Sequence, residues 1–142
     1  MLVYRLTHIH DQDEFVEYPT NYLGIYSSSD KVQEAISYYS QLPGFSDKRA
    51  KHLYLIEKQN VTVKESPPTV YVAELYLHDK EYWKEFIHLI GYFGTLEEAE
   101  KQAKEFSLIN ESFLSFAKED AEVIITRYII DDRYTKSGYS FD

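Results

Sequence analysis

The chain has no cysteine and contains little proline, glycine or methionine. Its 142 residues include four prolines, five glycines and one methionine. The absence of cysteine excludes disulfide bonds, a thiol nucleophile and cysteine-ligated zinc, and it favours a cytoplasmic protein. The isolated glycines form no phosphate-binding loop, and neither a Walker-type sequence nor a nucleophile elbow is present. The usual sequence signatures of nucleotide-binding proteins and serine hydrolases are therefore missing.

Long apolar runs are also missing. No segment approaches the ~18 consecutive apolar residues of a membrane-spanning helix. Residues 1–10 carry Arg5, His8 and His10 and have no apolar core of signal-peptide length. We therefore expect a soluble protein that does not bind membranes.

Positive charge is scarce, because 15 basic side chains stand against 24 acidic ones and leave a net charge of −9. Residues 1–67 contribute −2 and residues 68–142 contribute −7. Such a chain repels nucleic-acid phosphates and anionic lipids but attracts a basic protein. The chain contains 14 tyrosines, eight phenylalanines and one tryptophan. Aromatic residues are common in protein interfaces and are also favoured in β-strands.

The sequence repeats itself at a spacing of 67 residues. Three segments keep their apolar pattern at this offset: Val3-Tyr4 with Val70-Tyr71, Leu23–Tyr26 with Ile90–Phe93, and Val32, Ile36, Tyr39 and Leu42 with Ala99, Ala103, Phe106 and Ile109. One offset shared by three segments indicates two copies of one supersecondary unit. We predict a single domain, residues 1–142, made of two repeats at about 1–66 and 69–132, with a flexible tail at 133–142.

The first repeat has the pattern of two strands, a helix and a strand. Alternating side chains predict a strand over residues 2–10, and further strands are predicted at 21–27 and 52–58. A helix is predicted over 29–42, ended by Pro43-Gly44. Ser27-Ser28-Ser29 predicts hydroxyl caps at the start of this helix, with anion binding as the alternative.

The second repeat predicts the same order. Its strands are expected at 69–78, 88–93 and 122–130, with Val123–Ile125 as a buried run, and its helix at 95–107 with Thr95 and Glu98 as a capping box. A short helical stretch is predicted at 111–118, and Glu65–Pro68 is predicted to be the linker. The expected fold class is α+β: two tandem ββαβ units with pseudo-twofold symmetry, mainly antiparallel sheet with helices on one face.

Three motifs resemble a family of small uncharacterised bacterial domains: His8-Ile9-His10, Leu23–Ser28 and Leu42–Phe45, in that order. That family's pattern closes with a strand and an acidic, aromatic stretch, to which Leu75–Trp83 and Arg127–Tyr134 are similar. The resemblance covers most of residues 3–87, so residues 69–78 either close the first unit or open the second. It implies a bacterial origin and a fold but no activity. In size and charge the chain also resembles immunity proteins.

His8 and His10 are the sharpest candidates for metal chemistry. Residues at i and i+2 of a strand point to the same side, so the two imidazoles are able to share a metal ion with Asp11, Asp13 or Glu14. The segment comes close to the Thr-His-x-His-x-Asp-His motif of metallo-β-lactamase-like hydrolases, but Gln12 and Asp13 stand where that motif needs Asp and His. The second repeat has Leu75 and Leu77 at the equivalent positions, which favours a structural role for both histidines. We therefore predict no metal and no cofactor.

The segments after the first strand of each repeat combine carboxylates with bulky rings. The 67-residue offset aligns residues 13–18 with residues 80–85. A solvated turn with one aromatic packed back onto the core is one interpretation. Charged residues beside aromatic anchors are also typical of a protein-binding edge. The predicted partner-binding residues are Glu14, Phe15, Glu17, Tyr18, Glu81, Tyr82, Trp83 and Glu85.

The hypothesis that these observations favour is a non-enzymatic, acidic binding protein of the bacterial toxin-neutralising type. Its partner is expected to be a basic protein such as a toxin or nuclease, because opposite charge accelerates association. The chain itself is expected to be a monomer or a weak homodimer, without catalytic residues. The alternatives are a metal-dependent hydrolase using His8 and His10, and an adaptor that binds a peptide by strand addition at a sheet edge.

Overall fold

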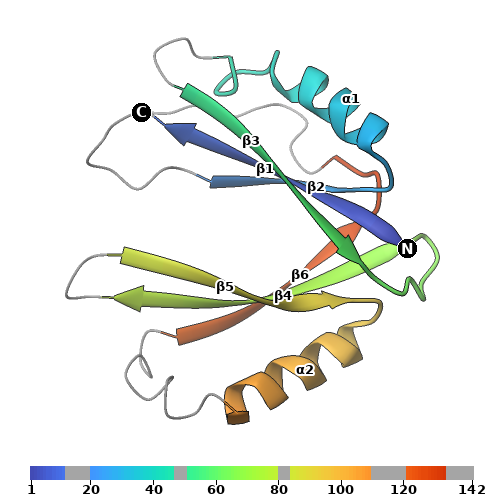
Figure 1. The fold of residues 1–142 in the computed structure, drawn as a ribbon, viewed down its shortest axis with the longest axis vertical. Helices are drawn as coiled ribbons and strands as arrows, with labels where there is room; N and C mark the ends of the chain where they lie inside the picture. Colours follow the sequence, from blue (N-terminus) through green and yellow to red (C-terminus); the bar gives the residue numbers. More distant parts are fainter. Residues whose placement is uncertain (12–19, 47–50, 80–83, 110–120, 134–142) are drawn as a thin grey trace. The chain divides into compact units, whose positions relative to one another are not determined.

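The computed structural model describes residues 1–11, 20–46, 51–79, 84–109 and 121–133 (Figure 1). In chain order the elements are β1 (Leu2–Asp11), β2 (Thr20–Tyr26), α1 (Ser29–Tyr39), β3 (Lys51–Asn60), β4 (Thr69–Asp79), β5 (Lys84–Phe93), α2 (Leu96–Ile109) and β6 (Ala121–Ile129). The chain divides into two compact units, Met1–Asn60 with Ile129–Asp142, and Val61–Tyr128. The predicted α+β class is confirmed.

The first unit is built around β1. This strand pairs antiparallel with β2 on one side and with β3 on the other, which gives the strand order β2-β1-β3. The pairing with β3 keeps one register along its whole length, from Leu2 opposite Asn60 to Asp11 opposite Lys51. The pairing with β2 shifts register between Leu6 and Thr7, as at a β-bulge.

Helix α1 lies on one face of this sheet (Figure 1). Ser28 caps its N-terminus, since the serine hydroxyl accepts a hydrogen bond from the Lys31 N–H at 3.2 Å. The predicted apolar stripe is confirmed, with Ile36 and Leu42 partly buried against a fully formed core. The buried members of that core are Leu6, Leu23, Tyr26, Val32, Ala35, Tyr39 and Phe45.

The predicted end of this helix was wrong by three residues. Helix α1 ends at Tyr39 rather than at residue 42. Pro43 lacks an N–H, and its ring disfavours helical backbone at Leu42. The chain therefore turns earlier, and the Leu42 N–H donates to the Tyr39 carbonyl at 2.9 Å. Gly44 then adopts a positive φ of 84°, which glycine tolerates without steric cost.

The second unit has the strand order β5-β4-β6, and its sheet is also antiparallel. Helix α2 packs on β4 and β5 (Figure 1), and its buried residues are Ala99 and Ala103. The Thr95 hydroxyl caps it by accepting the Glu98 N–H at 3.2 Å. The Lys64 ammonium donates to the Glu98 carboxylate and thereby lowers the pKa of that group.

Local geometry recurs at the offset of 67 residues. The pairing of β4 with β5 shifts register between Ala73 and Glu74, 67 positions after the shift in β1. Gly24 lies opposite Leu6 beside the first shift, and Gly91 lies opposite Ala73 beside the second. The caps at Ser28 and Thr95 are separated by the same offset.

The predicted burial of Val123–Ile125 was wrong. Val123 is 36% exposed, and Ile124 and Ile125 are only partly buried. Strand β6 lies at the edge of its sheet, where a strand has a neighbour on one side only. The buried residues at this end of the chain are Tyr128 and Ile130.

The boundaries of the compact units differ from those of the predicted repeats. The predicted linker at 65–68 belongs to the second unit, where the Tyr71 hydroxyl bonds the Glu65 carboxylate at 2.8 Å. The described residues 129–133 belong to the first unit. The predicted helical stretch at 111–118 and residues 134–142 of the predicted tail lie outside the described residues. No helix in the described ranges is long and apolar enough to cross a membrane.

Candidate functional sites

His8 lies at the centre of an aromatic cluster between β1 and β3. Its side chain is fully buried. The imidazole packs against the rings of Phe45, Tyr54 and His52, with centroid distances of 4.6, 5.2 and 5.1 Å. The register explains these contacts, because β1 and β3 place His8 directly opposite Tyr54. His8 is thus one of the core side chains of the first unit.

The hydrogen bonds of this imidazole indicate its tautomer. His8 Nε2 lies 2.9 Å from His52 Nδ1, and His8 Nδ1 lies 3.4 Å from the amide nitrogen of Asn21. An amide nitrogen only donates, so His8 Nδ1 accepts. In a neutral imidazole the proton is then on Nε2, which donates to His52.

This packing gives His8 a structural role. Its partner is His52 of β3, a residue that the sequence pattern did not connect with it because the two are 44 positions apart. Among the described residues there is no group of three or more His, Asp or Glu side chains arranged to hold a metal ion. Asp13 and Glu14 lie outside the described residues, as do the side chains of His10 and Asp11.

Seven of the eight predicted partner-binding residues lie outside the described residues: Glu14, Phe15, Glu17, Tyr18, Glu81, Tyr82 and Trp83. The eighth, Glu85, lies on β5 opposite His78. The strands that flank the two segments are described. β1 and β2 pair antiparallel up to Ile9 opposite Thr20, and β4 and β5 pair up to Asp79 opposite Lys84. Each predicted binding segment thus joins two paired strands.

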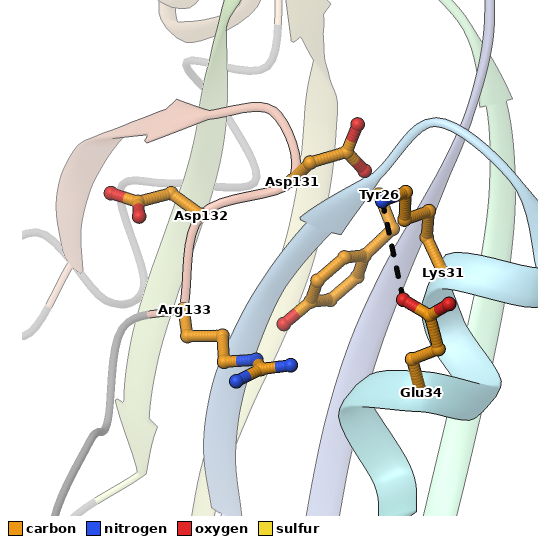
Figure 2. Close-up of a pocket in the computed structure, with 6 residues that line it drawn as sticks. All are labelled: Tyr26, Lys31, Glu34, Asp131, Asp132 and Arg133. Atoms are coloured by element: carbon orange, nitrogen blue, oxygen red, sulfur yellow. Dashed lines mark ion pairs between the residues drawn. The ribbon is translucent and has the colours of Figure 1, made fainter. Parts of the chain in front are cut away.

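A pocket of about 260 Å³ lies where β2 ends and α1 begins (Figure 2). Its lining comes from β2, from the first turns of α1, and from the segment that follows β6. The lining residues are Tyr26, Lys31, Glu34, Asp131, Asp132 and Arg133. All of them belong to the first unit. We call this site the turn pocket.

Asp131 fastens the segment after β6 to the start of α1. Its carboxylate accepts the Ser27 N–H at 2.8 Å and the Ser27 hydroxyl at 2.6 Å. Its own N–H donates to the Ile25 carbonyl at 2.8 Å. Asp131 has a positive φ of 67°, which Asp tolerates better than most residues. A carboxylate here is also favoured by the positive end of the helix dipole.

The same segment explains the glycine at position 24. Gly24 has φ +115°, and a Cβ atom there would lie 2.9 Å from the Asp132 carbonyl oxygen. Figure 2 shows the Asp132 side chain pointing away from Tyr26. The backbone of Asp132, rather than its carboxylate, is therefore what requires glycine in β2.

Tyr26, Arg133, Lys31 and Glu34 of the turn pocket have partners within the first unit. The Tyr26 hydroxyl donates to the Leu23 carbonyl at 2.6 Å, and burial raises the pKa of this phenol. The Arg133 guanidinium lies over the ring of Tyr38, 4.2 Å from its centroid. Lys31 and Glu34 form an exposed ion pair at 4.0 Å (Figure 2). A phenol with a raised pKa and an occupied hydroxyl is a poor base or nucleophile. The contacts that define this site are those by which Asp131 attaches the segment after β6 to the start of α1.

The sequence predicted the caps at Ser27–Ser29 but not their partner, Asp131, whose carboxylate accepts hydrogen bonds from Ser27. Asp131 is 104 positions from Ser27. The signal available in the sequence was the exposed N–H groups of a helix start, which an anion satisfies. Nothing in the spacing indicated that the anion would be a side chain of the same chain.

We expect Asp131→Ala to lower the free energy of unfolding by about 1–2 kcal/mol, because two hydrogen bonds at the helix start are lost. The measurement is urea denaturation followed by circular dichroism. Asp132→Ala is the matched control and should change stability by less than about 0.5 kcal/mol. Equal losses in the two variants would show that the Asp131 carboxylate contributes nothing particular to the fold.

We expect the fold to require a side chain of suitable size at position 8, but not an imidazole. His8→Leu places there the residue found at the equivalent position 75, and should change stability by less than about 1 kcal/mol, since Asn21 and His52 are half-buried and able to reach water. His8→Ala leaves a cavity and should cost about 2–4 kcal/mol. Thermal melts of both variants test this. A His8→Leu protein that fails to fold would contradict it.

The comparisons with known proteins assign no relatives: no family model, curated protein or solved structure matches this chain. The turn pocket and the His8 cluster are consequently interpreted from their own geometry. Both consist of side chains that bond one another.

Proposed function

We propose that this chain is a non-enzymatic, acidic binding protein of the bacterial toxin-neutralising type, acting in the cytoplasm on a basic protein such as a toxin or nuclease. The observation that carries the proposal is the pair of hairpins β1–β2 and β4–β5. They share the position of their register shift, and each joins its strands through a segment in which carboxylates stand beside aromatic rings. Residues 13–18 are acidic, whereas residues 80–85 balance two glutamates with Lys80 and Lys84. The resemblance to small uncharacterised bacterial domains belongs to the same proposal.

The two hairpins are proposed to be copies of one structural unit. The order of two strands, a helix and a strand occurs twice, with the central strand first in each case. The register shifts, the adjacent glycines and the helix caps all follow the 67-residue offset. Duplication would explain why both hairpins carry carboxylates beside rings. A crystal structure in which β1-β2-α1-β3 superimposes on β4-β5-α2-β6 is expected, and unrelated strand paths would refute the duplication.

Charge supports a basic partner. The chain carries −9 in total, and most of that excess lies after residue 67. Opposite potentials on two proteins raise the association rate, while aromatic anchors inside the contact lower the dissociation rate. Carboxylates beside Phe15 and Tyr18 supply both kinds of contact in the first segment, while Tyr82 and Trp83 supply anchors between glutamates and lysines in the second.

The hydrolase alternative has less support. His8 is buried and hydrogen-bonded to His52, so its nitrogens are engaged by the protein itself. The tyrosine hydroxyl of the turn pocket is also engaged. These contacts favour the binding role over metal-dependent hydrolysis.

Binding to the partner should weaken with salt and depend on the second hairpin. We expect the association rate to fall as ionic strength rises, because screening over ~8–10 Å weakens electrostatic steering. Tyr82→Ala or Trp83→Ala should weaken affinity by about 2 kcal/mol or more, and Glu85→Ala by less. Affinity capture from the source organism identifies the partner, and surface plasmon resonance at two salt concentrations measures its kinetics.

Leu96→Ala is the control for this experiment. Leu96 is exposed and lies at the start of α2, away from the hairpin segments in the sequence. Its variant should bind the partner as tightly as the unaltered protein. Binding that is insensitive to salt and to Trp83 would refute the toxin-neutralising proposal.

A further inference from the structure

Strand β3 leaves one edge of its sheet open in the part of the chain that the structure describes. It pairs with β1 on one side, and no described strand pairs with the other side. Three large apolar side chains on this one strand are exposed: Leu53 by 39%, Leu55 by 46% and Ile56 by 40%. We call these three residues the β3 strip.

This edge lacks the proline, the bulge and the short length that protect many edge strands from pairing, and its charged residues Lys51, Glu57 and Lys58 lie toward its two ends. Natural edge strands are commonly interrupted by proline or a bulge, or are very short. β3 has ten residues and no proline, and its register with β1 has no shift. By contrast, β2 at the opposite edge of the sheet is next to a register shift and contains Gly24. A long, regular edge with exposed leucines is therefore suited to being covered.

We propose that β3 pairs antiparallel with β3 of a second copy of this chain, across a twofold axis at Tyr54. This inference goes beyond the proposed function, because it names what covers the β3 strip. It depends neither on the hairpins nor on the toxin-neutralising role. A twofold axis perpendicular to the sheet keeps each face continuous across the pair. The two sheets become one sheet of six strands.

The register follows from the sequence of β3. With Tyr54 opposite itself, Leu53 lies opposite Leu55 of the second copy, and Leu55 lies opposite its Leu53. The same register places Glu57 opposite position 51, which is a lysine. On the face that carries Leu53 and Leu55, apolar side chains thus meet apolar ones and opposite charges meet, which stabilises cross-strand pairs. On the other face this register sets Ile56 opposite His52.

Other registers are less favourable. If the axis passes through Leu55, Leu53 lies opposite Glu57, which sets an apolar residue against a carboxylate. If it passes through Ile56, Leu55 lies opposite Glu57. A shift of the axis by one or two positions along the strand thus sets Leu53 or Leu55 opposite Glu57 instead of opposite a leucine. The axis at Tyr54 is the one that satisfies both leucines and the charges.

The dimer is expected to be weak, because one strand edge buries less than the ~1,200 Å² typical of a stable interface. Its formation should strengthen with salt, since two chains of charge −9 repel each other and salt screens that repulsion. The proposed binding to a basic partner has the opposite salt dependence. Failure of one proposal is therefore distinguishable from failure of the other.

Sedimentation velocity on the purified protein over a wide concentration range tests self-association. We expect a reversible dimer, and at least a tenfold weaker association for Leu55→Lys. Ile87→Lys is the matched control, since Ile87 is 45% exposed on β5 of the other sheet, and should associate like the unaltered protein. Melting curves of both variants show whether they are folded. A chain that stays monomeric at every concentration overturns the proposal. This holds whether the edge is covered instead by a strand of another protein or by another segment of the same chain.

Cysteine pairing tests the register, and the absence of native cysteine makes it unambiguous. Directly opposite residues lie about 4.5–5.5 Å apart between Cα atoms, which is within disulfide range. A mixture of Leu53→Cys and Leu55→Cys proteins should therefore form the mixed disulfide at least fivefold faster than a mixture of Leu53→Cys and Ile87→Cys. Faster linkage of Leu55→Cys to itself would overturn the axis at Tyr54, and equal rates in all mixtures would overturn the pairing.

Discussion

The first unit depends on the antiparallel pairing of β1 with a strand on each side. A central strand has neighbours for its backbone donors and acceptors on both sides, and its side chains alternate between the two faces of the sheet. Leu6 and His8 fall on the face covered by α1, where Leu6 joins the apolar core and His8 contacts Phe45 of that core. β3 pairs with β1 in one continuous register, and this places Tyr54 and His52 beside His8. The helix, the aromatic cluster and the open edge all follow from this arrangement.

The segment that follows β6 is the second feature that stabilises the first unit. Asp131 bonds Ser27 immediately before α1, and Arg133 lies on Tyr38 near the end of the same helix. The segment thus contacts α1 near both ends. Gly24 is needed because the backbone of Asp132 approaches β2 closely. These contacts explain why the first unit includes residues from both termini of the described chain.

The proposed function depends on surfaces of the protein rather than on a catalytic centre. The buried polar groups that resemble catalytic residues, His8 and Tyr26, donate and accept hydrogen bonds within the fold. The two proposals concern the hairpin segments, residues 13–18 and 80–85, and the β3 strip. They differ in chemistry: the hairpin segments combine charge with aromatic rings, while the β3 strip is aliphatic on a regular strand. A heterologous basic partner suits the first, and a second copy of the chain suits the second.

Short-range patterns in the sequence determined the elements of this fold. Alternation predicted β1, hydroxyl residues predicted the caps at Ser28 and Thr95, and helical spacing predicted a stripe of which Val32 and Tyr39 are buried. These features depend on residues within a few positions of one another. The exact helix end was less predictable, because the effect of Pro43 on Leu42 competes with an apolar pattern that runs on beyond Tyr39.

Tertiary structure alone decided which distant residues meet. His52 bonds His8 across 44 positions, and Asp131 bonds Ser27 across 104, and no periodicity carries such information. The exposure of Leu53, Leu55 and Val123 was likewise unpredictable, since alternation shows that a strand has two faces but not which strand lies at an edge. Strand order sets that, and it results from the pairing of whole strands. The sequence by itself determined the α+β class and the placement of its elements along the chain; the partners of its polar side chains were decided by the fold.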